Sequence, residues 1–174
     1  MKYNLEIDKI FLKLALCTTL ASATVILAKC VETAPAFKVE KSHLSQRDTE
    51  MIRIFKSYKS PHSIELGLAV NKTKYPKVLA SIALVESNGN INAIGDAGKS
   101  KGAFQIQSRY WGPVPKTATE QATQAEDILD GLLRSNPKAP LRLHIARYNG
   151  GNTPPKASFE YADKVLQINR SIKR

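Results

Sequence analysis

The sequence predicts a mainly α-helical domain with a small β-hairpin or loop region in its middle. Apolar residues recur at helical spacing in most of the chain. Residues 88–101 break this pattern, because they are rich in Asn, Gly, Asp and Ser and contain no long apolar run. The length of 174 residues suits one domain. We therefore expect a single compact core with a tightly turning segment between two groups of helices.

Residues 1–28 predict an export segment. Lysines at positions 2, 9 and 13 precede an uncharged apolar run at 14–28, which is shorter than the roughly 20 residues that span a bilayer. This layout is typical of a signal peptide that is cleaved after Ala28 or Ala36. The alternative is an anchor in the inner membrane, formed by residues 10–28. In both cases we expect an exported protein, periplasmic or extracellular.

Residues 29–45 contain proline and lack apolar periodicity, which indicates a linker, and the domain is expected at 46–174. Pro76 is a favourable first-turn residue, and Thr117 followed by Glu120 is a capping-box pattern. Glycines at 150 and 151 predict a helix end. Helices are expected at 46–58, 63–71, 76–86, 117–133, 137–149 and 158–172.

The chain is strongly basic, with 26 Lys and Arg against 15 Asp and Glu and a net charge of +11. Such a charge favours polyanionic partners. Because there is no zinc-finger spacing, RNP-like motif or leucine zipper, we do not expect nucleic acid. Charge alone does not choose between anionic lipid and an anionic cell-wall surface. The two cysteines, Cys17 and Cys30, offer no internal disulfide framework, and no His-Glu-x-x-His occurs. No metal and no cofactor are expected.

Glu86 is the main candidate for catalysis. It follows Leu79 by seven residues and Ile82 by four, so on a helix it points the same way as core residues. Partial burial of a carboxylate raises its pKa, as a general acid near neutral pH requires. The alternative is a solvated glutamate in the last turn of the helix.

Three ordered motifs extend this argument. They are Glu-Ser at 86–87, Gly-Ala-Phe-Gln-Ile-Gln at 102–107 and Ala-Arg-Tyr-Asn-Gly-Gly at 146–151. With them, the region from Tyr75 to Ile168 resembles the lysozyme-like superfamily, in its soluble lytic transglycosylase and goose-type lysozyme branch. That branch carries a Glu-Ser at a helix end, a Gly-Leu-Met-Gln-like strand and an Ala-Tyr-Asn-Ala-Gly-like helix end in the same order. The resemblance implies an α+β lysozyme-like fold.

The resemblance implies that Glu86 protonates a glycosidic oxygen and that other motif residues bind the sugar chain. Phe104 departs from the usual Met, but it could still supply an apolar wall. Tyr148 could instead be a core aromatic, and Asn149 could be a plain helix stop. Tyr161 resembles a packing residue of the family's final helix. The expected binding residues are Ser87, Gly102, Phe104, Gln105, Ile106, Tyr148 and Asn149.

Asp96 bears on the type of reaction. Glycoside hydrolysis uses two carboxylates, whereas a lytic transglycosylase uses one glutamate and lets the muramoyl 6-hydroxyl attack. Gly-Asp-Ala-Gly at 95–98 resembles the Gly-Asp-x-Gly of goose-type lysozymes, and the stretch from Gln105 to Trp111 resembles invertebrate-type lysozymes. The alternative is that Asp96 is a turn residue. Gln107 stands where goose-type enzymes have a further aspartate, which favours the transglycosylase.

Together these features predict cleavage of the β-1,4 bond between N-acetylmuramic acid and N-acetylglucosamine in peptidoglycan strands, by a monomer acting as a lytic transglycosylase. One alternative is a hydrolytic muramidase that uses Asp96. The other is a non-catalytic wall-binding or assembly protein of a secretion, conjugation or phage-entry apparatus.

Overall fold

The computed structural model describes residues 44–172, which fall within one compact unit, His43–Arg174. The expected export segment at 1–28 and nearly all of the linker at 29–45 lie outside the described residues. The described part is mainly helical with one small antiparallel sheet, which confirms the predicted fold class at this level. Its elements are α3 (Gln46–Ser57), α4 (Ser63–Asn71), α5 (Pro76–Ser87), β1 (Ile94–Gly95), the 3-10 helix η1 (Asp96–Gly98), β2 (Ser100–Lys101), β3 (Ile106–Gln107), α6 (Ser108–Trp111), α7 (Ala118–Ser135), α8 (Leu141–Gly150) and α9 (Lys156–Ser171).

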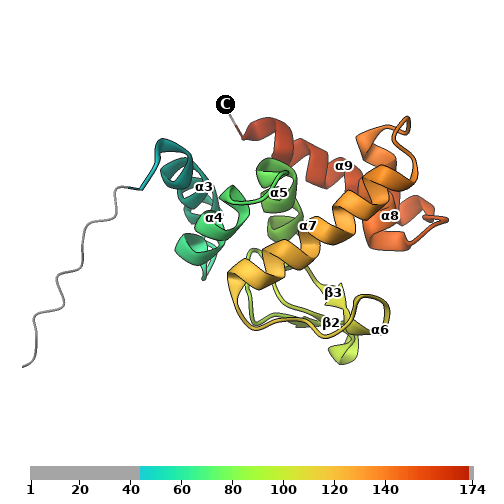
Figure 1. Ribbon diagram of the computed structural model, residues 1–174, viewed down its shortest axis with the longest axis horizontal. Coiled ribbons are helices and arrows are strands. Elements are labelled where there is room, and N and C mark those ends of the chain that lie inside the picture. The colour runs from blue at the N-terminus through green and yellow to red at the C-terminus, as the bar shows by residue number, and fades with distance from the viewer. Residues whose placement is uncertain (1–43, 173–174) are drawn as a thin grey trace, which may run out of the picture. The chain divides into compact units, whose positions relative to one another are not determined.

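Helix α5 is the centre of the core. It contacts α3, α4, α7 and α9, and Figure 1 shows it between the α3–α4 pair and α9. Leu79 and Ile82 are fully buried, which stabilises the fold by roughly 2–3 kcal/mol for each side chain. The helix begins at Pro76 and ends where Asn88 adopts a left-handed conformation with φ of 55°. Glu86 and Ser87 therefore form its last turn, next to the loop that follows.

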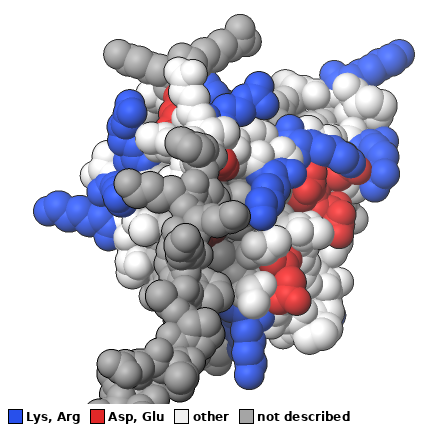
Figure 2. All heavy atoms as spheres, turned by 60° about the vertical axis from the view of Figure 1, so that its left-hand side comes forward, with Lys and Arg blue, Asp and Glu red and all other residues white. Residues whose placement is uncertain are grey.

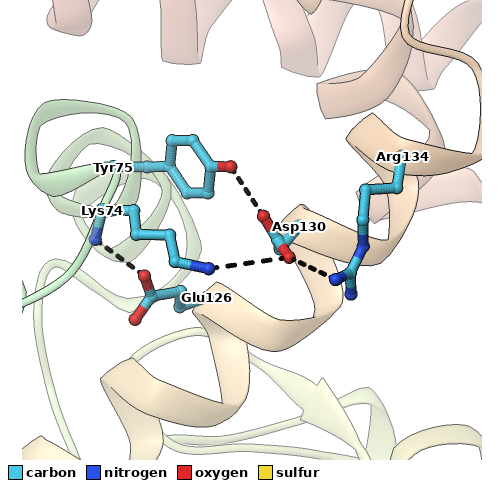
Figure 3. Close-up of polar contacts among 5 residues, drawn as sticks. All are labelled: Lys74, Tyr75, Glu126, Asp130 and Arg134. Atoms are coloured by element: carbon cyan, nitrogen blue, oxygen red, sulfur yellow. Dashed lines mark hydrogen bonds and ion pairs between the residues drawn. The ribbon is translucent and has the colours of Figure 1, made fainter.

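A cluster of polar side chains holds the start of α5 against α7 (Figure 3). The Tyr75 hydroxyl donates to Asp130 Oδ1 over 2.7 Å, and the backbone N–H of Lys74 donates to Glu126 Oε1 over 2.7 Å. Arg134 and Lys74 add ion pairs to Asp130 Oδ2 at 3.1 and 3.8 Å. Because Asp130 is mostly buried, these contacts fix the register between the two helices.

The small sheet has the strand order β1-β2-β3, with both pairs antiparallel. Its register places Gly95 opposite Ser100 and Lys101 opposite Ile106. Residues 102–105, expected to belong to a strand, form the turn between β2 and β3 instead. Gly102, at φ of 77°, and Gln105, at φ of 48°, both have the left-handed conformation that suits a tight turn and not a strand.

Two further helices differ from expectation. The helix predicted at 137–149 begins only at Leu141, because Pro140 has an extended conformation and forms its N-cap. Helix α6 was not predicted at all, since four residues are too few for apolar periodicity to show. Thr117 caps α7 by accepting from the backbone N–H of Glu120, as its sequence pattern predicted.

Basic side chains are distributed over the surface. On the face shown in Figure 2, Lys and Arg project at several separate places, and acidic groups lie between some of them. Among residues 44–172, no helix is both long and apolar enough to cross a membrane.

Candidate active site

A cleft of about 890 Å³ lies beside the end of α5. Helices α5, α7 and α8 line it together with the sheet, the turn before β3 and α6. Six of the nine residues predicted for the site line this cleft. They are Glu86, Asp96, Gln105, Ile106, Tyr148 and Asn149.

Glu86 enters the cleft from the last turn of α5 and is partly buried. Burial raises the pKa of its carboxyl group to about 7; the nearby Tyr161 hydroxyl opposes this shift, and the negative charge of Asp96 adds to it. The carboxyl-terminal end of a helix also disfavours a negative charge. Glu86 is therefore divided between its acid and base forms near neutral pH, which is the condition for general acid–base work.

Two tyrosines accompany Glu86. Burial, followed by the negative charge of Glu86, raises the pKa of both Tyr148 on α8 and Tyr161 on α9 far above the usual value, so both hydroxyls stay protonated. The Tyr148 hydroxyl donates to the carbonyl of Phe104 over 3.3 Å. The Tyr161 hydroxyl is buried and within reach of Glu86, but it makes no hydrogen bond of normal geometry. It is an available donor next to the carboxyl group.

Asp96 lies in η1 at the opposite end of the loop and is exposed. Its Oδ2 accepts from the Ser100 hydroxyl at 2.5 Å and from Gln107 Nε2 at 3.5 Å. Its φ of 48° is left-handed, a conformation that Asp adopts more readily than most other non-glycine residues, because its short side chain can hydrogen-bond locally. Asp96 is therefore a turn residue, and it also lines the cleft. Its catalytic role stays a prediction.

Three of the predicted residues do not line the cleft. The Ser87 hydroxyl donates to the carbonyl of Ala103 over 2.8 Å and so ties the helix end to the turn. Gly102 is buried in that turn. Phe104 needs the clearest correction, since its side chain is fully buried in the core and forms no wall of the cleft. Its backbone carbonyl accepts the hydrogen bond from Tyr148.

Gln121 on α7 holds this turn in place. Its Oε1 accepts from the backbone N–H of Ala103 over 2.8 Å. Its Nε2 donates to the carbonyls of Ile91 and Pro115 at 3.0 and 2.9 Å. A Cβ atom at Gly102 would come within 2.5 Å of Gln121 Oε1, so only glycine fits this turn as it stands.

The side chains of Gln105 and Asn149 are positioned by neighbours. Gln105 Nε2 donates to the carbonyl of Gly102 over 3.0 Å, and Asn149 Oδ1 accepts from the Ser158 hydroxyl over 2.8 Å. Each amide keeps hydrogen-bonding capacity for a ligand. The Ile106 side chain is 3% exposed and adds an apolar surface.

Several residues of the cleft were not predicted. Tyr110 and Trp111 are 66% and 48% exposed at its edge, unusually high values for large aromatic residues. Arg147, on α8 next to Tyr148, adds a positive charge. Tyr161 does not line the cleft; it packs against the core, as its interpretation as a packing residue predicted. The sequence signal for Arg147 and Trp111 is their position within or beside the motifs.

Within residues 44–172, no group of three or more His, Cys, Asp and Glu side chains is arranged to hold a metal ion. Comparison with models of known protein families gives no match, and a search of curated proteins gives none either.

Proposed function

We propose that this protein has a lysozyme-like fold and cleaves peptidoglycan strands at the β-1,4 bond between N-acetylmuramic acid and N-acetylglucosamine, as a lytic transglycosylase. One observation carries the proposal: a partly buried glutamate with a pKa of about 7 lines a cleft of about 890 Å³ with mostly polar walls. The order of the motifs around this glutamate, Glu-Ser, then Gln-Ile, then Tyr-Asn, supports it further.

The proposed reaction needs only one carboxyl group. Glu86 donates its proton to the glycosidic oxygen, and the bond from that oxygen to C1 of the muramoyl residue breaks. Positive charge then develops at C1, and the Glu86 carboxylate removes the proton from the muramoyl 6-hydroxyl. That oxygen attacks C1 and closes a 1,6-anhydro ring. A pKa of about 7 suits both steps, because the group must lose and regain its proton in each cycle.

The surrounding side chains support the binding of a sugar chain. Gln105 and Asn149 present amides for sugar hydroxyls and acetamido groups. Tyr110 and Trp111 present exposed aromatic surfaces, which can pack on the apolar faces of sugar rings. The positive charge of the chain would hold the protein on an anionic wall.

The observation that favours a hydrolytic muramidase instead is Asp96. It lines the same cleft as Glu86, and its carboxylate accepts hydrogen bonds from Ser100 and Gln107. In that mechanism Asp96 would activate water or attack C1.

The test is the digestion of purified sacculi with the wild-type protein and with Glu86→Gln, followed by mass spectrometry of the soluble fragments. The proposal expects 1,6-anhydro ends from the wild type and a loss of about 100-fold or more in the variant. Reducing ends would identify the muramidase. Binding to sacculi without fragment release would instead support a wall-binding or assembly protein of a secretion, conjugation or phage-entry apparatus. Wild-type activity in Glu86→Gln would overturn the assignment of Glu86.

A further inference from the structure

Arg147 is the one cationic residue among the described residues that line the cleft. It lies in the last turns of α8, directly before Tyr148. Its Nε atom is buried and has no hydrogen-bond partner, and no ion pair in the described part of the chain includes it. Arg142, in the first turn of the same helix, differs in this respect, because two of its nitrogens donate to Asp163 at 2.7 Å.

A buried, unpaired Nε donor on a charged group is costly. The group is charged at all pH values of interest and carries five donors in a fixed plane. A buried donor without an acceptor costs about 1–3 kcal/mol, and more when it is charged. The free protein therefore carries a cost that a bound anion would remove. A carboxylate matches the geometry best, because its two oxygens can accept from Nε and from one terminal nitrogen together.

The sugar backbone of the proposed substrate is neutral at N-acetylglucosamine, whereas muramic acid carries a lactyl carboxyl group. We propose that Arg147 binds a carboxylate on the muramoyl residue and thereby selects strands that carry this charge. This inference rests on the proposed function. The carboxylate has two possible sources: the free lactyl group of a peptide-free strand, or a carboxylate of the stem peptide where the lactyl group is amide-linked.

The experiment compares charged and neutralised strands. Peptide-free strands are prepared with an amidase that removes stem peptides, and half of them are converted to lactyl methylamides. Peptide-bearing strands are also divided into two halves. In one half the carboxylates of the stem peptides are converted to methylamides. kcat/KM is measured on all four for the wild type, for Arg147→Gln and for Arg53→Gln. Arg53 is an exposed residue of α3 outside the cleft, so its variant loses the same charge without touching the site.

In one of the two pairs of substrates, peptide-free or peptide-bearing, the wild type and Arg53→Gln should cleave the charged strand about 10- to 100-fold faster than the methylamidated strand. This is the effect expected for a hydrogen bond between charged groups. Arg147→Gln should cleave both at the slow rate. Arg147→Lys, which keeps the charge but not the planar fork, should retain part of the preference. A preference confined to peptide-free strands identifies the lactyl carboxylate, and one confined to peptide-bearing strands identifies the stem peptide. Equal rates of the wild type on charged and neutral strands would overturn the proposal.

Failure of the proposed function is a separate result. If the wild type cleaves none of the four strands, the affinities of Glu86→Gln and of Glu86→Gln/Arg147→Gln for the same strands still decide the role of Arg147. If Glu86→Gln binds the charged strand more tightly than the neutral one, and the double variant binds both equally, the inference is supported without catalysis. Equal affinities in both variants would contradict it, and thermal melting of each variant would show whether its fold is retained.

Discussion

Glu86 and Asp96 line the same cleft from the two ends of one loop, and the negative charge of Asp96 raises the pKa of Glu86. Glu86 belongs to the rigid end of α5, whereas Asp96 is exposed in η1. The two carboxyl groups are therefore electrostatically coupled, although their surroundings differ. This coupling can be tested whichever reaction the protein catalyses.

Replacing Asp96 with Asn should lower the pKa of Glu86, because it removes a nearby negative charge. The alkaline limb of the pH profile of kcat/KM should then move to lower pH. As a lytic transglycosylase, the variant should still release 1,6-anhydro fragments. A loss of about 100-fold or more would instead mark Asp96 as the second carboxylate of a hydrolase.

Tyr161→Phe should have the opposite effect on the pH profile. The Tyr161 hydroxyl lowers the pKa of Glu86, so its removal should raise that pKa and move the alkaline limb to higher pH. Tyr110→Phe is the control, since Tyr110 is mostly exposed at the edge of the cleft. An unchanged limb in Tyr161→Phe would show that this hydroxyl does not interact with the acid.

Glu86→Gln should stabilise the fold at alkaline pH. The pKa of Glu86 is raised from 4.5 to about 7 in the folded protein, so the folded state binds more protons between these values. The resulting stability is fully present below pH 4.5 and is lost as the pH rises through 7. At pH 8 the ionised group costs up to about 3 kcal/mol, which glutamine avoids.

Urea unfolding at pH 4, 6 and 8 measures this difference. The free energy of unfolding of Glu86→Gln should exceed that of the wild type most at pH 8 and approach it at pH 4. Glu65→Gln, at an exposed position of α4, is the control for losing a carboxylate. A Glu86→Gln variant that is less stable than the wild type at pH 8 would contradict the burial of this group.

Gly102→Ala should lower the free energy of unfolding by about 2 kcal/mol or more. The substitution combines a left-handed φ with a Cβ atom pressed against Gln121. Gly98→Ala is the matched comparison, because Gly98 has φ of 89° but no atom within 4 Å of an added Cβ. It should cost about 1 kcal/mol, from backbone conformation alone. Equal losses in the two variants would remove the role assigned to Gln121.

Asp130→Asn should lower the melting temperature at neutral pH. Hydrogen bonding from Tyr75, and then the charges of Arg134 and Lys74, hold the pKa of Asp130 below its usual value. This contribution to stability is present above the unfolded pKa of 3.8 and is lost as the pH falls through the lower folded value. The difference in melting temperature should therefore shrink in acid. Asp127→Asn, at an exposed position of the same helix, should change little at either pH.

Most of the longer helices could be predicted from the sequence, because apolar residues recur in them at helical spacing and several of their ends carry a recognisable signal. Pro76 begins α5, Thr117 caps α7 and Gly151 ends α8 with φ of 76°. Such signals depend only on neighbours along the chain. The strand expected at 102–105 came from the resemblance to a Gly-Leu-Met-Gln-like strand. No local pattern opposed it, because a run as short as Ala103–Phe104 has no distinct periodicity.

The site was harder to predict where the positions of side chains depend on packing. Phe104 occurs in a motif, but its side chain is fully buried in the core, and its carbonyl accepts from Tyr148. Arg147 and Tyr161 reach the surroundings of Glu86 because α8 and α9 pack together and α9 packs on α5. These contacts join residues far apart in sequence, so no local pattern in one chain reveals them.

The three hydrogen bonds of Gln121 have a consequence for how this protein could diversify. They attach Ile91, Ala103 and Pro115 to one side chain of α7, and they divide the loop region into two segments with fixed ends. Insertions inside either segment would leave these attachments intact, whereas a shift at one of them would break a buried hydrogen bond. We therefore expect homologues to vary in loop length within 92–102 and 104–114, and to keep glutamine at the equivalent of position 121.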